Sequence, residues 1–269
     1  MSDLQILNQI KKEPFSTNCF MLENQIFDIE GKCHYKTVQD KGLFAFFKNS
    51  NYHFKHLNFY LDSNNVTENT KINWNEDFFV TEIITANDKT EQNEKIKNWL
   101  ITQDNFHYHT YFRMLRTDKT KFNLDYSRVQ HPSEEDFYKI ILYLEKTFDI
   151  YTERIPNLDK LRALQKSSYI IKENNEIAAI LITEIKGKNQ ELYFMVTLPE
   201  YEGNGYGSIL MTHIFSNPEI QRWVMWVDTS NERVIEWYYK IGYKKDKLIN
   251  NIYISKKIMN DKSFISFVH

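Results

Sequence analysis

Glycine is scarce in this chain except at one place, and that place most limits what the chain can fold into. The 269 residues include only seven glycines, and Gly203, Gly205 and Gly207 alternate within five residues. Such glycines permit backbone dihedrals that other residues avoid, and they let another molecule approach the main chain closely. One glycine would serve a simple turn, so the cluster predicts a backbone that binds a ligand.

The segments around these glycines predict a strand, a glycine-rich turn and a helix, in that order. Residues 191–197 (ELYFMVT) are typical of a strand, and a helix is expected from about Ser208 to Phe215. Successive N–H groups of such a turn point into one concavity, and the helix N-terminus adds partial positive charge. The spacing matches neither a dinucleotide fingerprint nor a P-loop, because the third glycine comes one residue early and no Gly-Lys-Ser/Thr follows. A phosphate site of another kind is therefore expected.

The rest of the chain predicts alternating helices and strands. In the C-terminal half, helices are expected after the start signals Ser133–Asp136 and Pro156–Asn157. Further elements expected there are a hairpin over 169–184, a strand over 223–227, a helix over 232–240 ended by Gly242, and two short strands around Lys247 and Tyr253. In the N-terminal half we expect strands over 43–48, 57–61, 78–85 and 108–116 and a helix over 93–102.

Composition excludes several classes of protein. The 34 basic and 36 acidic residues give a net charge of −2, so no basic surplus exists for nucleic acid. No apolar run approaches the roughly 20 residues that a membrane helix needs, and the first 15 residues lack a signal-peptide pattern. Only Cys19 and Cys33 occur, which is neither a disulfide framework nor a zinc site. We therefore expect a cytoplasmic protein without a metal, monomeric or homodimeric, that binds neither nucleic acid nor membrane.

Two motifs resemble those of one known family, the Gcn5-related N-acetyltransferases (GNAT superfamily). The first is Pro199-Glu-Tyr-Glu-Gly-Asn-Gly-Tyr-Gly207, and the second is Asn231 followed by a helix that holds Tyr238 and ends in Gly242-Tyr243. Both motifs stand in the family's order, and the resemblance covers about residues 126–258. It implies an α/β (α+β) GNAT fold, with a mixed central sheet flanked by helices.

The resemblance also implies where acetyl-CoA would bind. The main chain of the glycine-rich loop would hold the pyrophosphate, with the Ser208 hydroxyl in reach; this loop comprises Glu202, Gly203, Asn204, Gly205, Tyr206 and Gly207. The strand before the loop would splay from its neighbour and pair with the pantetheine arm through Met195, Val196 and Thr197, and Asn231 would contact the same arm. Glu202 departs from the family's usual Arg or Gln, and a carboxylate beside a pyrophosphate is unfavourable if it points inward.

The catalytic groups are expected from the same comparison. Tyr238 would protonate the leaving thiolate as general acid, although Trp237 and Tyr239 are neighbours that could take its place. Glu191 is the candidate general base, with Glu184 and Asp228 as alternatives. The acceptor site would include the loop between the first two helices, through Phe148, Asp149, Tyr151 and Arg154.

The N-terminal half is predicted to be a separate, non-catalytic α/β domain, with residues 1–125 forming one domain and 126–269 the acetyltransferase domain. A faint repeat aligns 93–96 with 231–234 and places Leu100, which cannot donate a proton, at the position of Tyr238. The stretch 62–77 has no glycine and no amphipathic helix, so it cannot form a pyrophosphate loop. A degenerate GNAT-like copy and an unrelated α/β domain both remain open at this point.

The predicted function is transfer of an acetyl group from acetyl-CoA to a primary amine of a small molecule or peptide, by direct attack. Two alternatives remain. One is a non-catalytic acyl-CoA-binding or regulatory protein, which is suggested by Glu202 at the position of the family's usual Arg or Gln. The other is an acyltransferase that uses a longer acyl-CoA or a carrier-protein thioester. The identity of the acceptor does not follow from the sequence.

Overall fold

The structure, a computed structural model, describes residues 1–12, 14–40, 42–62, 71, 72, 74, 78–86, 90–120 and 122–260. It has a mixed α/β fold in which helices flank mostly antiparallel strands. The chain divides into two compact units, Met1–Thr110 with Lys247–His269, and Tyr111–Asp246. We call them the first and the second unit.

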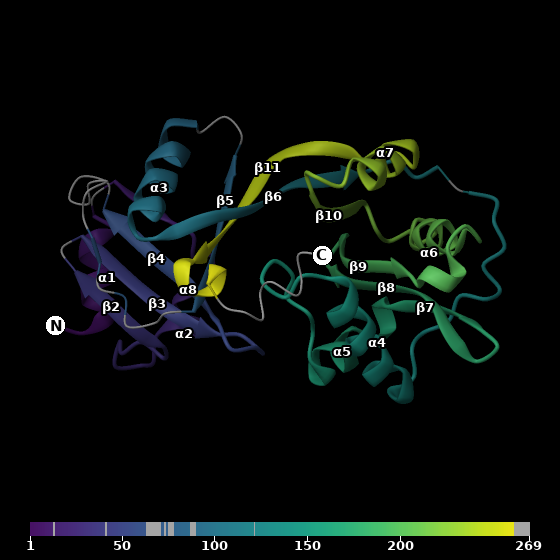
Figure 1. Ribbon diagram of the computed structural model, residues 1–269, viewed down its shortest axis with the longest axis horizontal. Helices are drawn as coiled ribbons and strands as arrows, with labels where there is room; N and C mark the ends of the chain where they lie inside the picture. Colours follow the sequence, from purple (N-terminus) through teal and green to yellow (C-terminus); the bar gives the residue numbers. More distant parts are fainter. Residues whose placement is uncertain are drawn as a thin grey trace. The chain divides into compact units, whose positions relative to one another are not determined.

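The first unit combines the N-terminal elements with residues 247–260 (Figure 1). Its helices are α1 (Asp3–Ile10), α2 (Glu23–Ile26), α3 (Thr90–Thr102) and α8 (Lys256–Met259). Its strands are β1 (Phe15–Thr17), β2 (Lys36–Asp40), β3 (Leu43–Asn49), β4 (Lys55–Asp62), β5 (Phe79–Ala86), the first part of β6 (Asn105–Arg116) and most of β11 (Lys244–Ser255). The strand order is β2-β3-β4-β5-β11-β6, and β1 pairs with β4.

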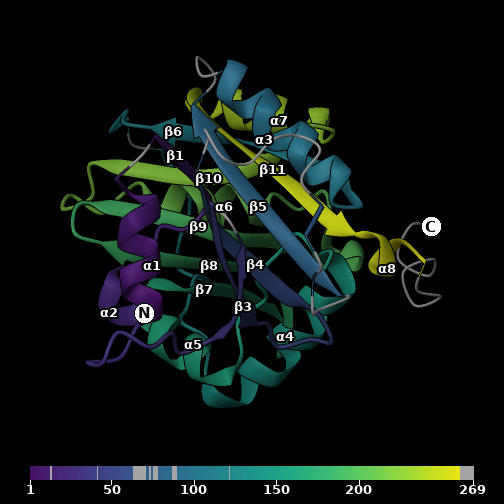
Figure 2. The same ribbon diagram turned by 90° about the vertical axis from the view of Figure 1, so that its left-hand side faces the viewer.

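Alternation along the strands of the first unit produces two hydrophobic layers. Phe44 and Phe46 of β3 pack with α1 and α2 on one face, whereas Ala45 and Phe47 pack on the face that holds Trp99 of α3. Both cysteines are buried and free in the α1 and α2 layer. Figure 2 shows the molecule with the first unit toward the viewer and labels α1, α2, α3 and β3.

The second unit contains both predicted motifs. Its helices are α4 (Glu134–Thr147), α5 (Leu158–Leu164), α6 (Tyr206–Ile214) and α7 (Glu232–Lys240), with 3₁₀ turns at Gln165–Ser167 and Pro199–Tyr201. Its strands are β7 (Tyr169–Glu173), β8 (Glu176–Lys186), β9 (Asn189–Thr197), β10 (Arg222–Asp228), the second part of β6 and the start of β11. The strand order is β7-β8-β9-β10-β6, and of these pairs only β9 with β10 is parallel.

The second unit also has one helical layer on each face of its strands (Figure 1). Phe137 of α4 and Leu161 of α5 pack against Ile180, Ile182 and neighbouring residues of β7 to β9. Leu210 of α6 and Tyr238 of α7 pack against the opposite face. The start of α4 is as predicted, because the Ser133 N–H donates to Oδ2 of Asp136 at 2.8 Å.

Most predicted elements are confirmed, with differences at their ends. The hairpin is β7 and β8, the strand before the glycines is β9, and α7 has the predicted bounds. The prediction of two short strands around Lys247 and Tyr253 is wrong, because β11 runs unbroken from Lys244 to Ser255. The elements α1, β1, α2 and β2 were not predicted. Most of the segment 62–77 lies outside the described residues.

The compact units differ from the predicted ranges 1–125 and 126–269. The strand β6 begins in the first unit and ends in the second, and β11 begins in the second and ends in the first. Each unit therefore takes one strand from the other half of the sequence. A strand pattern does not reveal which strand will be its partner, so a single cut along the chain was the simplest prediction.

Candidate active site

The central feature of the second unit is the point where β9 and β10 part. Their parallel pairing runs from Asn189 opposite Arg222 to Leu192 opposite Met225. Beyond that pair, β9 continues to Thr197 and β10 continues to Asp228. β10 stays paired with β6 up to Asp228, and β9 stays paired with β8 up to Thr197. The two strands therefore splay apart, as the resemblance implied.

A β-bulge stands where the splay begins. Ile182 of β8 pairs with Phe194, but the next residue, Thr183, pairs with Leu192, so Tyr193 is an extra residue on β9. A bulge leaves one residue unpaired and bends its strand, which gives β9 a physical reason to leave β10 at this point. Sequence reasoning missed the bulge, because no glycine or proline marks it.

The edge of β9 in the splay is open among the described residues. Leu198 donates its N–H to Ala178 of β8 at 2.9 Å. Since successive residues of a strand point their N–H groups to opposite edges, Val196 faces β8, and Met195 and Thr197 face the splay. An extended ligand that carries amides could pair with these two residues as an added strand.

The glycine-rich turn lies at the same end of β9 as this open edge. Gly203 and Gly205 adopt left-handed backbone conformations, with φ of 82° and 78°. Gly205 is the N-cap of α6, and no side chain among the described residues caps that helix. The first intrahelical bond is donated by Ile209 to Gly205, so the N–H groups of Tyr206, Gly207 and Ser208 precede the helical ladder. Backbone N–H groups in this arrangement are able to bind an anion.

The turn is held in place by a side chain to which the sequence had suggested no structural role. The phenol of Tyr206, the first residue of α6, donates a hydrogen bond to Glu173 at the end of β7 and accepts one from Arg128 at 3.2 Å. Arg128 also pairs with Glu173 at 2.5 Å. Tyr206 is buried, so its side chain anchors the turn and leaves its N–H for a ligand.

Glu202 does not block the turn. Its side chain is exposed, and it makes no ion pair with any residue that the structure describes. Its N–H donates to Pro199 at 3.3 Å. The carboxylate therefore lies in water, where its effect on a nearby anion is screened.

Asn231 begins α7, directly after β10. Its Oδ1 accepts the N–H of Val234 at 3.3 Å, which makes it the N-cap of the helix. Its amide NH₂ group is left as a donor next to the splay. Asp228 accepts the N–H and the hydroxyl of Ser230 at 2.8 and 2.7 Å, which orders the turn between β10 and α7.

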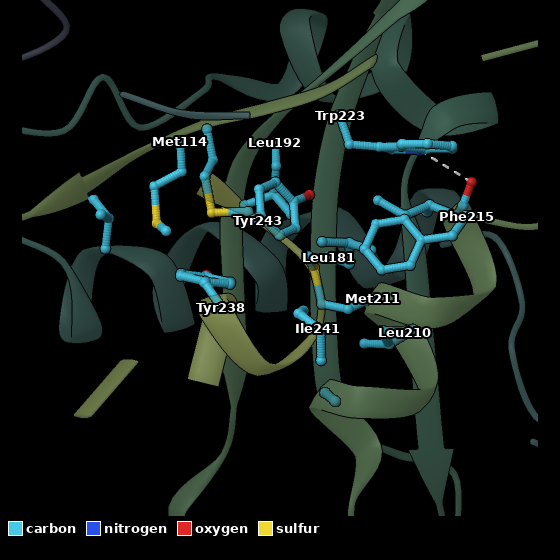
Figure 3. Close-up of a cluster of buried hydrophobic side chains, with 14 of the residues drawn as sticks. Met114, Leu181, Leu192, Leu210, Met211, Phe215, Trp223, Tyr238, Ile241 and Tyr243 are labelled. Atoms are coloured by element: carbon cyan, nitrogen blue, oxygen red, sulfur yellow. Dashed lines mark hydrogen bonds between the residues drawn. The ribbon is translucent and has the colours of Figure 1, made fainter. Parts of the chain in front are cut away.

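Tyr238 faces the sheet, and its neighbour Tyr239 faces solvent. Tyr238 is 5% exposed and Tyr239 is 47% exposed. Figure 3 shows Tyr238 on α7 beside Met114 and Tyr243 in the buried cluster, and its ring centroid lies 5.6 Å from that of Tyr243. Burial raises the pKa of Tyr238, so the phenol keeps its proton at neutral pH. This orientation favours Tyr238 over Tyr239 as the functional tyrosine.

Glu191 and Glu184 belong to one polar cluster beside the bulge. Lys186 contacts Glu191 at 2.7 Å, Glu184 at 3.0 Å and the Tyr193 hydroxyl at 2.9 Å. Lys160 of α5 contacts Glu184 at 2.7 Å. Burial acts to raise the pKa of Glu184, but hydrogen bonds from Lys160, Tyr193 and Lys186 outweigh burial and lower that pKa to about 2. Glu191 precedes Leu192, the last paired residue, so it stands next to the splay.

The loop between α4 and α5 brings the predicted acceptor residues near β9. The ring centroid of Phe148 lies 5.1 Å from that of Phe194. Asp149 accepts the N–H of Tyr151 at 2.8 Å, which orders the loop. Tyr151 is buried within the loop, whereas Arg154 is exposed.

Tyr111 of β6 connects this loop to the end of β10, and sequence reasoning missed it. Burial raises the pKa of Tyr111, and the charges of Glu153, Asp228 and Asp149 raise it further. Three carboxylates therefore act on one buried phenol. None of them forms a group suited to a metal ion among the described residues.

A parallel strand pair that splays beside a glycine-rich anion turn, with a capped helix after the second strand, defines an α/β domain of the GNAT type. Residues 130–243 match the model of the acetyltransferase (GNAT) family, so this part of the chain is similar to that family. No helix among the described residues is long and apolar enough to cross a membrane.

Solved structures share this fold at low sequence identity. A GCN5-related N-acetyltransferase from Sphaerobacter thermophilus has 8% identity and a TM-score of 0.55, over 86% of this chain and 79% of that chain. A Drosophila protein has 14% identity and a TM-score of 0.52, over 95% and 88%. A GCN5-related glucosamine N-acetyltransferase region of a fungal multi-domain GH3 β-N-acetylglucosaminidase has 10% identity and a TM-score of 0.56, over 84% of this chain and 32% of that chain. At these identities the likeness concerns the fold alone.

Proposed function

We propose that this chain is an acyl-CoA-dependent N-acetyltransferase that moves the acetyl group of acetyl-CoA to a primary amine by direct attack. One observation carries the proposal: the open edge of β9 and the uncapped turn at Gly205 lie at the same end of one strand. A pantetheine arm needs an open strand edge, and a pyrophosphate needs unpaired backbone N–H groups such as those of the turn. CoA thioesters contain both groups in series.

The donor would be held mainly by the backbone. The N–H groups of residues 203–208 would receive the pyrophosphate, since the Glu202 N–H already donates to Pro199, and Met195 and Thr197 would pair with the amides of the arm. Gly207 lies against the same residues, because a Cβ built on it would meet Oγ1 of Thr197 at 3.5 Å and Cε of Met195 at 3.9 Å. The amide of Asn231 would reach the arm from the start of α7.

Tyr238 would then act on the sulfur. The amine nitrogen forms a bond to the thioester carbonyl carbon, the carbon–sulfur bond breaks, and the thiolate takes the phenol proton. The proton that the nitrogen then loses to become an amide restores the phenol. Tyr238 carries its proton at neutral pH and would present it to the sulfur as the carbon–sulfur bond breaks. A free thiol has a pKa of about 8.5, below that of a phenol, and burial raises the pKa of Tyr238 further, so the role depends on the position of the hydroxyl beside the sulfur and not on its acidity.

Glu191 would accept the proton that the ammonium must lose before it attacks. Its position one residue before the splay supports this role, and its side chain is 27% exposed, so a proton can leave to water. Lys186 holds the carboxylate at 2.7 Å and would have to share it with the acceptor.

The acceptor is proposed to be a cationic amine that also carries some apolar surface. The carboxylates Asp149, Glu153 and Asp228 would attract its charge. Phe148 beside Phe194 offers an apolar contact near the splay, and Arg154 could engage an anionic group elsewhere on the acceptor. Tyr151 would act by shaping the loop, since its own side chain is buried.

The experiment is a panel of amines, incubated with acetyl-CoA and the full chain and scored by release of free thiol. Amino sugars, amino acids, peptide N-termini and lysine side chains are the first classes to test. We expect release with at least one cationic class and its loss in Tyr238→Phe. If acetyl-CoA binds and no amine, with acetyl-CoA or a longer acyl-CoA, releases thiol, the transferase proposal is wrong and the chain is an acyl-CoA-binding protein.

A further inference from the structure

The two units repeat one strand arrangement. In the second unit, β7-β8-β9-β10 pair as antiparallel, antiparallel and parallel. In the first unit, the neighbouring pairs of β2-β3-β4-β5 are likewise antiparallel, antiparallel and parallel. A helix follows the last strand in both, α7 after β10 and α3 after β5. By this correspondence β4 takes the place of β9, and β5 takes the place of β10.

The first unit also repeats the splay. The parallel pairing of β4 and β5 consists of Lys55 opposite Phe79 and His56 opposite Val80. After these pairs, β4 runs on to Asp62 and β5 runs on to Ala86, where it is paired with β11. The edge of β4 from Leu57 onward therefore corresponds to the edge of β9 to which we assigned the pantetheine arm.

In the first unit this edge is occupied by the chain itself. β1 pairs antiparallel with β4, with Phe15 opposite Asp62, Ser16 opposite Leu61 and Thr17 opposite Tyr60. The other edge of β4 is taken by β3 over residues 55–61. Since a strand has only two edges, β1 lies on the edge that β5 leaves at the splay.

Two side chains continue the pairing where β1 ends. Asn18 donates its amide to the Leu57 carbonyl and accepts the Phe59 N–H, both at 2.8 Å. The Thr17 hydroxyl donates to the Phe59 carbonyl at 2.6 Å. Asn18 is 8% exposed and Ser16 is 5% exposed. The amide of Asn18 thus reproduces the donor and acceptor that a peptide-like arm would offer to β4.

We propose that residues 15–18 close the arm-binding edge of the first unit, as a built-in substitute for pantetheine, so that the chain takes up one CoA thioester and takes it up at β9. This inference rests on the proposed function for the role of β9. The sequence agrees with it, because no glycine occurs between Gly42 and Gly187, and β4 is therefore not followed by a glycine-rich turn.

Hydrogen exchange of single amides in the full chain tests the closure without a ligand. We expect the Phe59 amide to exchange at least about 100-fold more slowly than an unstructured amide, and the Met195 and Thr197 amides to exchange much faster than Phe59. Asn18→Ala should accelerate exchange at Phe59 by about fivefold or more, because it removes a buried acceptor. Asn8→Ala, at an exposed position of α1 in the same unit, is the control and should leave Phe59 unchanged. Fast exchange at Phe59 in the wild-type chain would overturn the proposal.

Acetyl-CoA separates this inference from the proposed function. Titration calorimetry should give one equivalent per chain, and the ligand should slow exchange at Met195 and Thr197 but not at 57–62. Two equivalents, or slowing at β4, would show that the edge is not closed. No slowing at either strand, with Phe59 slow in an Asn18-dependent way, would uphold the closure and refute the proposed donor site.

Discussion

Arg116 and Gly242 occupy adjoining space at the end of α7, such that a Cβ on Gly242 would collide with Nη1 of Arg116. Gly242 also has a φ of 91°. Arg116 is 1% exposed and donates hydrogen bonds to the carbonyls of Ile241 and Thr120. Its guanidinium lies 4.2 Å from the ring centroid of Phe215. A buried cation from β6 therefore holds the end of the helix that carries Tyr238, and the glycine of the second motif makes room for it.

Gly242→Ala is expected to destabilise the chain more than a change at another left-handed glycine. Gly187 has a φ of 60°, and no atom lies within 4 Å of the point where a Cβ would stand, so Gly187→Ala carries backbone strain alone, about 1 kcal/mol. Gly242→Ala adds the collision with Arg116 and should cost about 2 to 4 kcal/mol. Urea unfolding of both variants compares the costs, and equal costs would mean that Arg116 moves aside freely.

Acetyl-CoA should stabilise the fold by about 2.7 kcal/mol at 100 times its Kd. Gly207→Val is the informative change, because Gly207 has no left-handed backbone and its side chain would point toward Thr197 and Met195. It should leave the free chain's Tm nearly unchanged and weaken acetyl-CoA binding at least about tenfold. Gly205→Val would not separate ligand binding from stability, since valine is strained at a φ of 78° and would destabilise the free chain as well. A thermal scan without any acetyl-CoA shift in the wild-type chain would refute the donor assignment.

Tyr238→Phe tests the general acid. The change keeps the ring that packs against Tyr243 and removes only the hydroxyl. We expect kcat to fall by about 100-fold while acetyl-CoA affinity is kept, as for loss of a positioned acid. Tyr239→Phe is the matched control, because Tyr239 is exposed one position along the same helix. Equal losses at both positions would contradict the assignment.

The pKa of Glu184 predicts how stability depends on pH. In the folded chain the pKa of Glu184 is about 2, below the usual range of a glutamate. The contacts of Glu184 with Lys160 and Lys186 therefore stabilise the fold at pH values above about 4.3, and this stabilisation is lost as the pH falls toward 2. Glu184→Gln should therefore cost about 1 to 3 kcal/mol at pH 7 and less at pH 3, by urea unfolding. Glu176→Gln breaks an ion pair with Lys139 that is about half exposed, and it should cost little at either pH. A Glu184→Gln cost that is independent of pH would refute the linkage.

Fragments distinguish the compact unit from a single cut along the chain. Residues 126–269 lack Tyr111–Arg116, the partners of β10, and keep a β11 without β5. We expect this fragment not to fold cooperatively. Residues 111–246 keep every strand pair of the second unit and should unfold cooperatively and bind acetyl-CoA. Circular dichroism and calorimetry measure the folding of both fragments. If residues 126–269 fold cooperatively and residues 111–246 do not, the unit boundaries are wrong.

Local patterns were sufficient for most elements of the second unit and for the glycine-rich turn. The strand before Gly203, the turn and the helix after it depend on neighbours in the sequence, and so do the capping of α7 by Asn231 and its end at Gly242. Backbone conformation at glycine and hydrogen bonds within one turn are short-range effects, so they can be predicted from residue types. The sequence left Trp237 and Tyr239 as alternatives to Tyr238, and the packing of α7 on the sheet decided between them.

Pairing between distant segments decided the rest. Nothing near Tyr193 predicts its bulge, nothing in β6 or β11 indicates that each ends in the other unit, and nothing near Phe15 predicts that β1 lies on β4. Arg116 meets Ile241 across 125 residues, and Asn18 meets Phe59 across 41. Such contacts depend on which strand edges and buried polar groups remain unsatisfied once the layers have packed. A buried donor or acceptor must find a partner wherever the fold places one, and the residue types alone do not say where that is.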